Sequence, residues 1–296
     1  MRRHVCQLAE EIGERNVQRR PGELAQAADY VQAEFAGSGG TVRRQEYPVR
    51  DVVCANIELE LPGRRQAQEI IVVGAHYDSV VGSAGANDNG SGVAALLCLG
   101  TRCAQETFDR TLRFVAFANE EAPFFQTEAM GSWVYARRCR QRNEQLVAMM
   151  SLETIGYYTD QPGTQNYPVP FAMLYPSTGN FIGFVANTAS AGLLRDLLTE
   201  FRRCEPFPAE GGAFPAFVPG VGFSDQWSFW QEGYPGVMIT DTAMYRYPFY
   251  HLPEDTADKI DFDRLARVVR GLHGTITVLA NRGSAPGNAP ATVPAG

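Results

Sequence analysis

The sequence contains little of several features that would assign it to a particular class of protein. No apolar run approaches the roughly 18 residues that a transmembrane helix needs, and the best candidate, Val93–Leu99, is far shorter. Acidic residues outnumber basic ones, 33 to 26, which gives a formal net charge of −7. Because phosphate backbones are bound by basic surfaces, we expect neither a membrane span nor a nucleic-acid partner.

Cysteine pairs and an export signal are also missing. None of the six cysteines forms a C-x-x-C pair, which argues against a cysteine-based zinc site. The first residues, MRRHVCQLAEEIGERN, contain no apolar core of a secretory signal. As written, the chain is expected to be cytoplasmic with free thiols. Export is the alternative, and only then would disulfides be expected.

What is present is the composition of a globular protein. The chain has 296 residues, of which 45% are hydrophobic and 20% charged, ordinary values for a domain with a sizeable core. No internal repeat or shift of composition marks a second domain. We therefore predict one domain over residues 1–282, followed by a disordered tail over residues 283–296, which are rich in Pro, Ala and Gly.

Apolar periodicity predicts an α/β fold. Continuous apolar runs and apolar–polar alternation predict strands at Val53–Leu61, Ile70–Ala75, Thr111–Ala118, Ala148–Leu152, Ala172–Tyr175 and Val237–Thr240. Helical periodicity predicts helices at Gly22–Gly37, Ser91–Ala104, Ala129–Arg142, Asn180–Ala189, Ala191–Phe201, Ser224–Gln231 and Asp261–Leu279. Strands that alternate with helices predict a central, twisted, mostly parallel (mixed) sheet with helices on both faces. The segment Pro206–Gly222 is expected to be an ordered loop.

The first candidate site follows the buried strand at Ile70–Ala75. The run ends in His76 and Asp78, and a Gly/Ser/Asn-rich stretch then presents Asp88. A neutral imidazole binds divalent metals, and a nearby carboxylate commonly holds its other ring N–H. Asp78 is suited to that task, and Asp88 is free to approach a metal or to bridge two.

Three further places carry acids or histidine after predicted strands. Glu120 and Glu121 directly follow the strand RFVAFA; adjacent acids there are costly unless they are compensated, and their diverging side chains suit one ligand and one general base. Glu153 follows the apolar run AMMSL, where a lone acid is more often a surface residue. His251 stands among turn-forming residues in YHLPEDT, whereas the remaining two histidines, His4 and His273, lie in helix-like segments.

Together these residues supply two histidines and several carboxylates, mostly at the carboxyl ends of strands. Open α/β sheets place their sites at those ends. A mixed nitrogen and oxygen ligand set suits Zn²⁺, with Co²⁺ or Mn²⁺ as substitutes. The sequence therefore predicts a metal centre.

Five motifs carry a family resemblance: GAHYDS, GANDNGSG, FANEE, SLETIG and YHLPEDT, in this order. Each alone is weak, but all five in order are specific. The chain resembles the M28 family of zinc metallopeptidases, of the bacterial aminopeptidase type, over roughly residues 5–280. The resemblance implies the zinc-peptidase (phosphorylase/hydrolase-like) fold and a catalytic domain over residues 1–282.

The resemblance also implies a ligand set. Family members hold two zinc ions about 3.5 to 4 Å apart. His76 and Glu153 would bind one zinc, Glu121 and His251 would bind the other, and Asp88 would bridge them. The Glu153 position is Asp in the best-known aminopeptidases of the family, so two zinc ions are expected and one is the alternative.

Three more roles follow from the resemblance. Glu120 would be the general base that takes a proton from the attacking water, and Asp78 would orient His76. Tyr250 resembles a tyrosine that steadies the oxyanion in some members. Ser224-Asp225-Gln226 stands where the family has Ser-Asp-His; because Gln226 replaces the histidine, we assign this stretch no catalytic role.

The function implied is a zinc-dependent aminopeptidase acting on peptides with a free N-terminus. The Phe-rich segment Phe214–Phe223, with Phe124 and Phe125, suggests an apolar pocket for the N-terminal side chain. A single-zinc glutaminyl cyclase is the main alternative, but such enzymes usually have a Trp-His pair where this chain has Tyr250-His251 and lack the GANDNGSG form of the loop. A non-catalytic scaffold typically loses ligands that are all present here. The sequence makes no prediction of oligomeric state.

Overall fold

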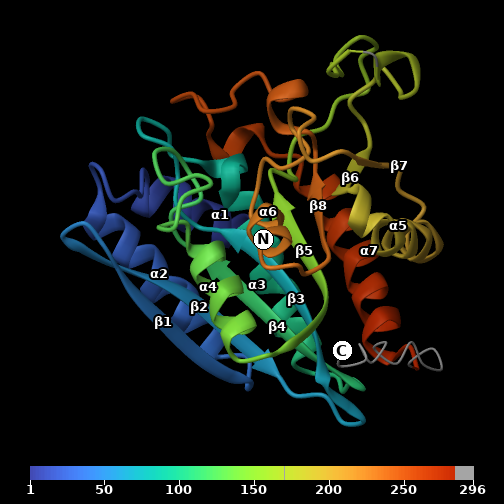
Figure 1. The fold of residues 1–296 in the computed structure, drawn as a ribbon. Helices are drawn as coiled ribbons and strands as arrows, with labels where there is room; N and C mark the ends of the chain where they lie inside the picture. The colour runs from blue at the N-terminus through green and yellow to red at the C-terminus, as the bar shows by residue number, and fades with distance from the viewer. Residues whose placement is uncertain (170, 284–296) are drawn as a thin grey trace, which may run out of the picture.

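The computed structural model describes residues 1–169 and 171–283, and these are built around one eight-stranded sheet (Figure 1). The strands are β1 (Thr41–Val49), β2 (Val52–Leu61), β3 (Gln66–His76), β4 (Arg110–Phe117), β5 (Gln145–Glu153), β6 (Ile182–Asn187), β7 (Ala209–Phe214) and β8 (Gly236–Thr240). The α-helices are α1 (Arg2–Cys6), α2 (Pro21–Ala36), α3 (Gly92–Cys103), α4 (Gly131–Gln141), α5 (Ala191–Cys204), α6 (Gln226–Gln231) and α7 (Phe262–Asn281).

The sheet is mixed, with the order β1-β2-β4-β3-β5-β8-β6-β7. Its four central strands, β4, β3, β5 and β8, are parallel to one another, whereas β1 and β2 add an antiparallel ribbon at one side. On the other side β6 runs antiparallel to β8, and β7 is parallel to β6. His76 pairs with Phe117, and Glu153 with Thr240. The carboxyl ends of the central strands therefore meet at one edge.

Helices cover both faces of the sheet. On one face, α2 contacts β2, α3 contacts β3, β4 and β5, and α7 contacts β4. The apolar residues of these helices form the larger core. Helices α4 and α6 contact β2, β5 and β8 and close a smaller core, in which Tyr135 and Phe229 pack on Val72, Val115 and Met149. Both faces of the central strands are buried, which explains why these strands are apolar throughout. The predicted α/β fold is confirmed.

Several predicted elements are wrong or incomplete. Asn180–Ala189, predicted to be a helix, contains β6, because its apolar residues pair with β8 and β7 rather than follow a helical stripe. Ala172–Tyr175, predicted to be a strand, overlaps a single 3-10 turn at Phe171–Met173. β1 was not predicted, and β7 lies inside Pro206–Gly222, predicted to be a loop. Edge strands carry a weak apolar signal, since one side meets solvent.

Two further predictions concern the C-terminal tail and membrane-spanning helices. Except for Gly283, the predicted disordered tail lies outside the described residues. Among the residues that the structure describes, no helix combines the length and apolarity needed to cross a bilayer.

Candidate metal centre

The edge where the central strands end gathers all the predicted site residues. His76 is the last residue of β3 and Glu153 the last of β5, while Glu120 and Glu121 follow β4 after a two-residue connection. Asp88 is carried by the irregular turn Ala86–Ser91 that precedes α3, and Tyr250 and His251 lie in the loop after β8. Side chains as far apart in the sequence as His76 and His251 thus share one site.

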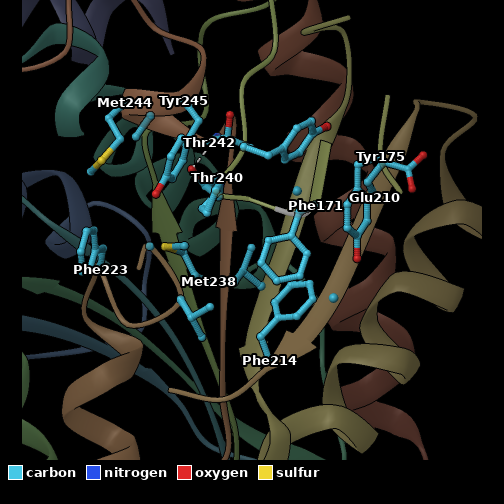
Figure 2. Close-up of a pocket in the computed structure, with 18 of the residues that line it drawn as sticks. Phe171, Tyr175, Glu210, Phe214, Phe223, Met238, Thr240, Thr242, Met244 and Tyr245 are labelled. Atoms are coloured by element: carbon cyan, nitrogen blue, oxygen red, sulfur yellow. Dashed lines mark hydrogen bonds between the residues drawn. The ribbon is translucent and has the colours of Figure 1, made fainter. Parts of the chain in front are cut away.

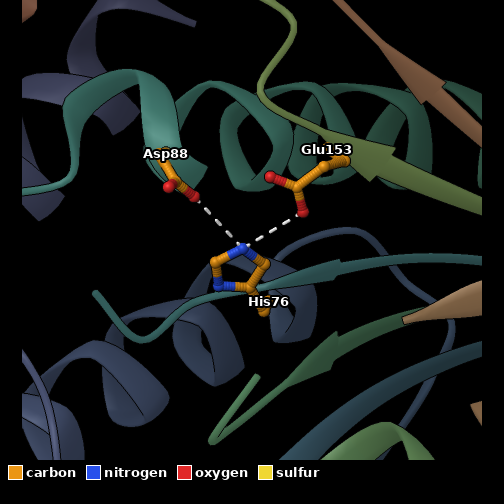
Figure 3. A group of neighbouring side chains, drawn as sticks. All are labelled: His76, Asp88 and Glu153. Carbon is orange, nitrogen blue, oxygen red and sulfur yellow. Dashed lines mark ion pairs between the residues drawn. The ribbon is translucent and has the colours of Figure 1, made fainter. Parts of the chain in front are cut away.

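The first group of side chains is His76, Asp88 and Glu153 (Figure 3). The Nε2 atom of His76 lies 3.4 Å from Asp88 Oδ1 and 3.3 Å from Glu153 Oε2. All three residues are buried, and their ligand atoms lie within 4.8 Å of one another. Two carboxylates and one imidazole that converge in this way suit a divalent cation.

The second group is Asp88, Glu121 and His251. The Nε2 atom of His251 lies 3.1 Å from Asp88 Oδ2 and 3.3 Å from Glu121 Oε2. Asp88 therefore belongs to both groups and turns one carboxylate oxygen to each histidine. This is the arrangement that a bridging ligand between two metal ions requires.

The turn that carries Asp88 is fixed by acceptors from distant parts of the chain. Both carboxylate oxygens of Asp255 accept backbone N–H groups, one from Asn87 at 2.8 Å and one from Asp88 at 3.0 Å. The Asn87 side chain donates to Asp241 and accepts the N–H of Gly156. Each contact removes freedom from the turn, so that Asp88 is held before any metal binds.

Asp78 supports the site in two ways. Its Oδ1 lies 3.5 Å from Nδ1 of His76, at the long limit of a hydrogen bond. Its two oxygens also accept the backbone N–H groups of Glu120 and Glu121, each at 3.1 Å. Asp78 therefore lies where the predicted orienting acid of His76 should be, and it also fixes the backbone of both glutamates.

Glu153 is held by two hydroxyl groups. Ser224 donates to its Oε2 and Thr154 to its Oε1, each at 2.7 Å. The backbone of Thr154, at φ +47°, is in the left-handed region that a β-branched residue seldom adopts. His251 and Asn119, which precedes Glu120, share this feature with φ +60°. Such strained positions gather at functional sites.

Sequence reasoning missed the roles of Ser224, Asp255 and Asn87. Ser224 and Asp255 stand within stretches that were considered, Ser224-Asp225-Gln226 and YHLPEDT, but their partners lie 71 and about 168 residues away. A local sequence pattern cannot indicate hydrogen bonds between residues so far apart in the chain. Gln226 is fully buried and donates to the carbonyl of Val221.

The site concentrates negative charge, which shifts the pKa values of its groups. Burial raises the pKa of Glu120 well above its usual value, and Glu153 and Glu121 add to this rise against the lowering effect of His76. Burial alone would lower the pKa of His251, but Asp88 and Glu121 outweigh it and raise the value to about 10. Unless a cation binds, protons held by the histidines and by carboxyl groups such as Glu120 must offset the negative charge.

The unpartnered atoms of the site also fit metal ions. Both ring nitrogens of His76, Oδ2 of Asp88 and Oε1 of Glu121 are buried without a hydrogen-bond partner among the described residues. Buried polar atoms are rarely left in this state. Because these atoms belong to residues of the two groups, and His76 Nε2 and Asp88 Oδ2 face the site, the residues present fit a pair of divalent cations.

A pocket adjoins the metal centre (Figure 2). Glu153 and Tyr250 stand at its border with the two groups, and its walls come from β6, β7, β8 and the connecting loops. Phe171 and Phe214 pack against one another with ring centroids 4.6 Å apart. Of the aromatic residues suggested by the sequence, Phe214 and Phe223 line the pocket, whereas Phe124 and Phe125 are not among its lining residues.

Tyr250 joins the pocket to the second group. Its ring stacks on that of His251 with centroids 3.9 Å apart and an interplanar angle of 18°. Burial and the surrounding carboxylates, Asp88 first, raise the pKa of the phenol well above its usual value. The hydroxyl group therefore stays protonated and is able to donate a hydrogen bond.

A sheet with two carboxylate–imidazole groups at its strand ends is typical of metal-dependent hydrolases. The sequence profile of peptidase family M28 matches residues 56–276. The chain therefore belongs to peptidase family M28, a family of hydrolases that act on peptides, as the motifs indicated.

Individual relatives extend this comparison. The Escherichia coli (strain K12) protein YfbL is 38% identical over 267 residues, which cover 87% of this chain and 80% of that protein. A probable leucine aminopeptidase of Arthroderma otae is 25% identical over 251 residues, 80% of this chain but only 61% of the relative's length.

Solved structures share the fold. BSAP, a zinc aminopeptidase from Bacillus subtilis, superimposes with a TM-score of 0.74 at 15% identity, covering 95% of this chain and 94% of that one. A glutaminyl cyclase from Fimbriiglobus ruber superimposes with a TM-score of 0.69 at 20% identity, covering 94% of this chain and 93% of that one. At these identities the likeness concerns the fold alone.

Proposed function

We propose that the chain is a zinc-dependent aminopeptidase that removes N-terminal residues from peptides. The observation that carries the proposal is the pair of ligand groups that share Asp88, with Glu120 beside them and a pocket at their border. His76 and Glu153 would hold one zinc ion, and Glu121 and His251 the other. The names of the aminopeptidase relatives and structural neighbours support this choice of metal and reaction.

The bound ions would acidify a water molecule and polarise the scissile carbonyl group. Glu120 would take the proton from the attacking water and pass it to the leaving amine. In the metal-free site burial raises the pKa of Glu120, and bound cations would lower it again, which would keep the carboxylate ionised to accept the proton. Tyr250, with its neutral phenol, would donate a hydrogen bond to the oxygen of the carbonyl as charge develops there.

The pocket suggests which N-terminal residues fit. Phe171, Phe214, Phe223 and Met238 give it a largely apolar wall. Burial of a large apolar side chain there would stabilise the complex by about 1.5–3 kcal/mol. We therefore propose bulky apolar N-terminal residues as the preferred substrates.

A substrate panel tests the proposal. Purified protein is assayed on leucyl, phenylalanyl, alanyl and glutamyl p-nitroanilides and on a peptide with N-terminal glutamine. Turnover of the leucyl compound that EDTA abolishes and Zn²⁺ restores is expected. Cyclisation of the glutaminyl peptide without nitroaniline release would replace the proposal by a glutaminyl cyclase, and inactivity with bound zinc would point to a scaffold.

A further inference from the structure

Arg15 is a cation buried beside the metal centre. Its side chain has no exposed surface, although burial of a charge is costly unless it is well compensated. The guanidinium group lies 2.5–3.3 Å from five backbone carbonyl oxygens, those of Leu8, Gly13, Tyr77, Ala84 and Gly85. These hydrogen bonds all go to the backbone, so the Arg15 side chain fixes the course of the main chain rather than the position of another side chain.

Three of these carbonyls belong to residues 77–85, the segment that leads from His76 to the turn of Asp88. The backbones are joined too, because Arg15 N–H donates to Ser79 Oγ at 3.1 Å and Ser79 N–H donates to the Arg15 carbonyl at 2.9 Å. Ser79 Oγ in turn donates to the carbonyl of Ser83. Residues near the N-terminus are therefore hydrogen-bonded to the segment that joins the two ligands His76 and Asp88.

Gly85 is the point at which this contact reaches Asp88. Its carbonyl accepts both Arg15 Nη2 at 2.9 Å and the N–H of Gly90 at 3.1 Å, which closes the turn. Gly85 has φ +60°, and a Cβ there would lie 2.4 Å from the Asp88 carbonyl oxygen. The turn is thus packed against Gly85 too closely to shift independently of it.

The charge of Arg15 also interacts electrostatically with the carboxylates of the site. Burial lowers the pKa of Arg15 to about 10, against the raising effect of Asp78, Asp255 and Asp88. The group stays protonated at neutral pH and offsets part of the negative charge of the carboxylates. Arg15 lies well before residue 56, where the match to the family begins.

We propose that Arg15 is a positioning residue of the metal centre, whose guanidinium group fixes residues 77–85 so that Asp88 is presented between His76 and His251. The fork of the guanidinium group, which binds several carbonyls at once, is the property that matters. An ammonium group keeps the charge but lacks that planar geometry. The inference rests on the proposed metal centre, but its test is independent of hydrolysis.

Arg15→Lys and Arg113→Lys form a matched pair. Arg113 is also buried, but it donates to Glu60 and Glu144, outside the metal centre. For each variant, zinc affinity and stoichiometry are measured by chelator competition, the Co²⁺ absorption spectrum is recorded, and thermal unfolding is followed without metal. Arg15→Lys should weaken zinc binding by about tenfold to a hundredfold and alter the Co²⁺ spectrum, whereas Arg113→Lys should change only the unfolding temperature.

Wild-type zinc affinity and an unchanged Co²⁺ spectrum in Arg15→Lys would reduce Arg15 to a structural residue and overturn the proposal. If that variant does not fold, Ser79→Ala serves instead, since it removes the hydroxyl group between Arg15 and Ser83. Its zinc affinity should fall in the same direction by a smaller factor, and an unchanged affinity would again overturn the proposal. Failure of the metal centre itself would show separately, as absence of zinc from the wild type.

Discussion

Replacement of Glu120 by glutamine should abolish nearly all turnover and leave the metal content intact. Glu120 Oε2 lies 3.9 Å from His76 Nε2, beyond the 3.3 Å and 3.4 Å at which Glu153 and Asp88 lie. The amide fills the same space but accepts no proton. Loss of a general base costs about 10²–10⁴-fold in kcat, which corresponds to about 2.7–5.4 kcal/mol of activation free energy.

The assay is steady-state hydrolysis of leucyl-p-nitroanilide, with zinc determined by atomic absorption in the same samples. Glu128→Gln is the control, because Glu128 is exposed and pairs with Arg137, away from the metal centre. The wild-type rate should fall as the pH drops below the pKa of Glu120, and this limb should vanish in the variant. Activity of Glu120→Gln within about tenfold of the wild type, at full zinc content, would refute the assignment.

Three further predictions concern the ligands, protons and pocket. Asp88→Ala should lose both zinc ions and Glu153→Ala only one; equal losses by metal analysis would contradict the shared-ligand geometry. Zinc affinity should rise with pH between about 6.5 and 10, because His251, with its pKa raised to about 10, must lose its proton to bind zinc. Calorimetry in two buffers of different ionisation enthalpy measures the protons that zinc uptake releases. A zinc affinity that does not change with pH would contradict the prediction. The raised pKa of His251 also affects the metal-free fold. The charged imidazole stabilises that fold below about pH 6.5, and this stabilisation is lost as the pH rises toward 10. Phe214→Ala should lower kcat/KM for leucyl relative to alanyl p-nitroanilide by about tenfold, and an unchanged ratio would remove Phe214 from the pocket wall.

The central strands and their terminal acids could be predicted because their signals are local. A fully apolar run such as Ile70–Ala75 indicates a strand buried on both faces, and a polar residue at its end indicates the edge of the sheet. Among the side strands, β2 was predicted from its alternating pattern, but β1, β6 and β7 carry no such signal. Ile182–Asn187 contains alternating small and large residues that suit either a helix or a strand, and its pairing with β8, about 55 residues away, decides the outcome.

Asp78 could be predicted as a support of His76, but the supporting contacts of Arg15, Asp255 and Ser224 could not, because they join segments far apart in the chain. Arg15 binds carbonyls 62 to 70 residues away, and Asp255 binds N–H groups 167 and 168 residues away. Backbone carbonyl and N–H groups are the same in every residue, so no side-chain pattern marks a segment as the partner of Arg15. Only the assembled fold identifies these residues as part of the site.

Charge balance explains why ligands and supports occur together. The described residues at the site include eight buried carboxyl groups, those of Asp78, Asp88, Glu120, Glu121, Glu153, Asp225, Asp241 and Asp255. Burial raises the pKa of Asp225 and of Asp241 to about 7, so these groups oppose folding when ionised. The nearby cations are His76, His251, Arg15 and Arg246, too few to compensate every carboxylate. The excess negative charge favours divalent ions, and metal binding should therefore stabilise the fold as well as the site, by about 2.7 kcal/mol at a free concentration of 100 Kd.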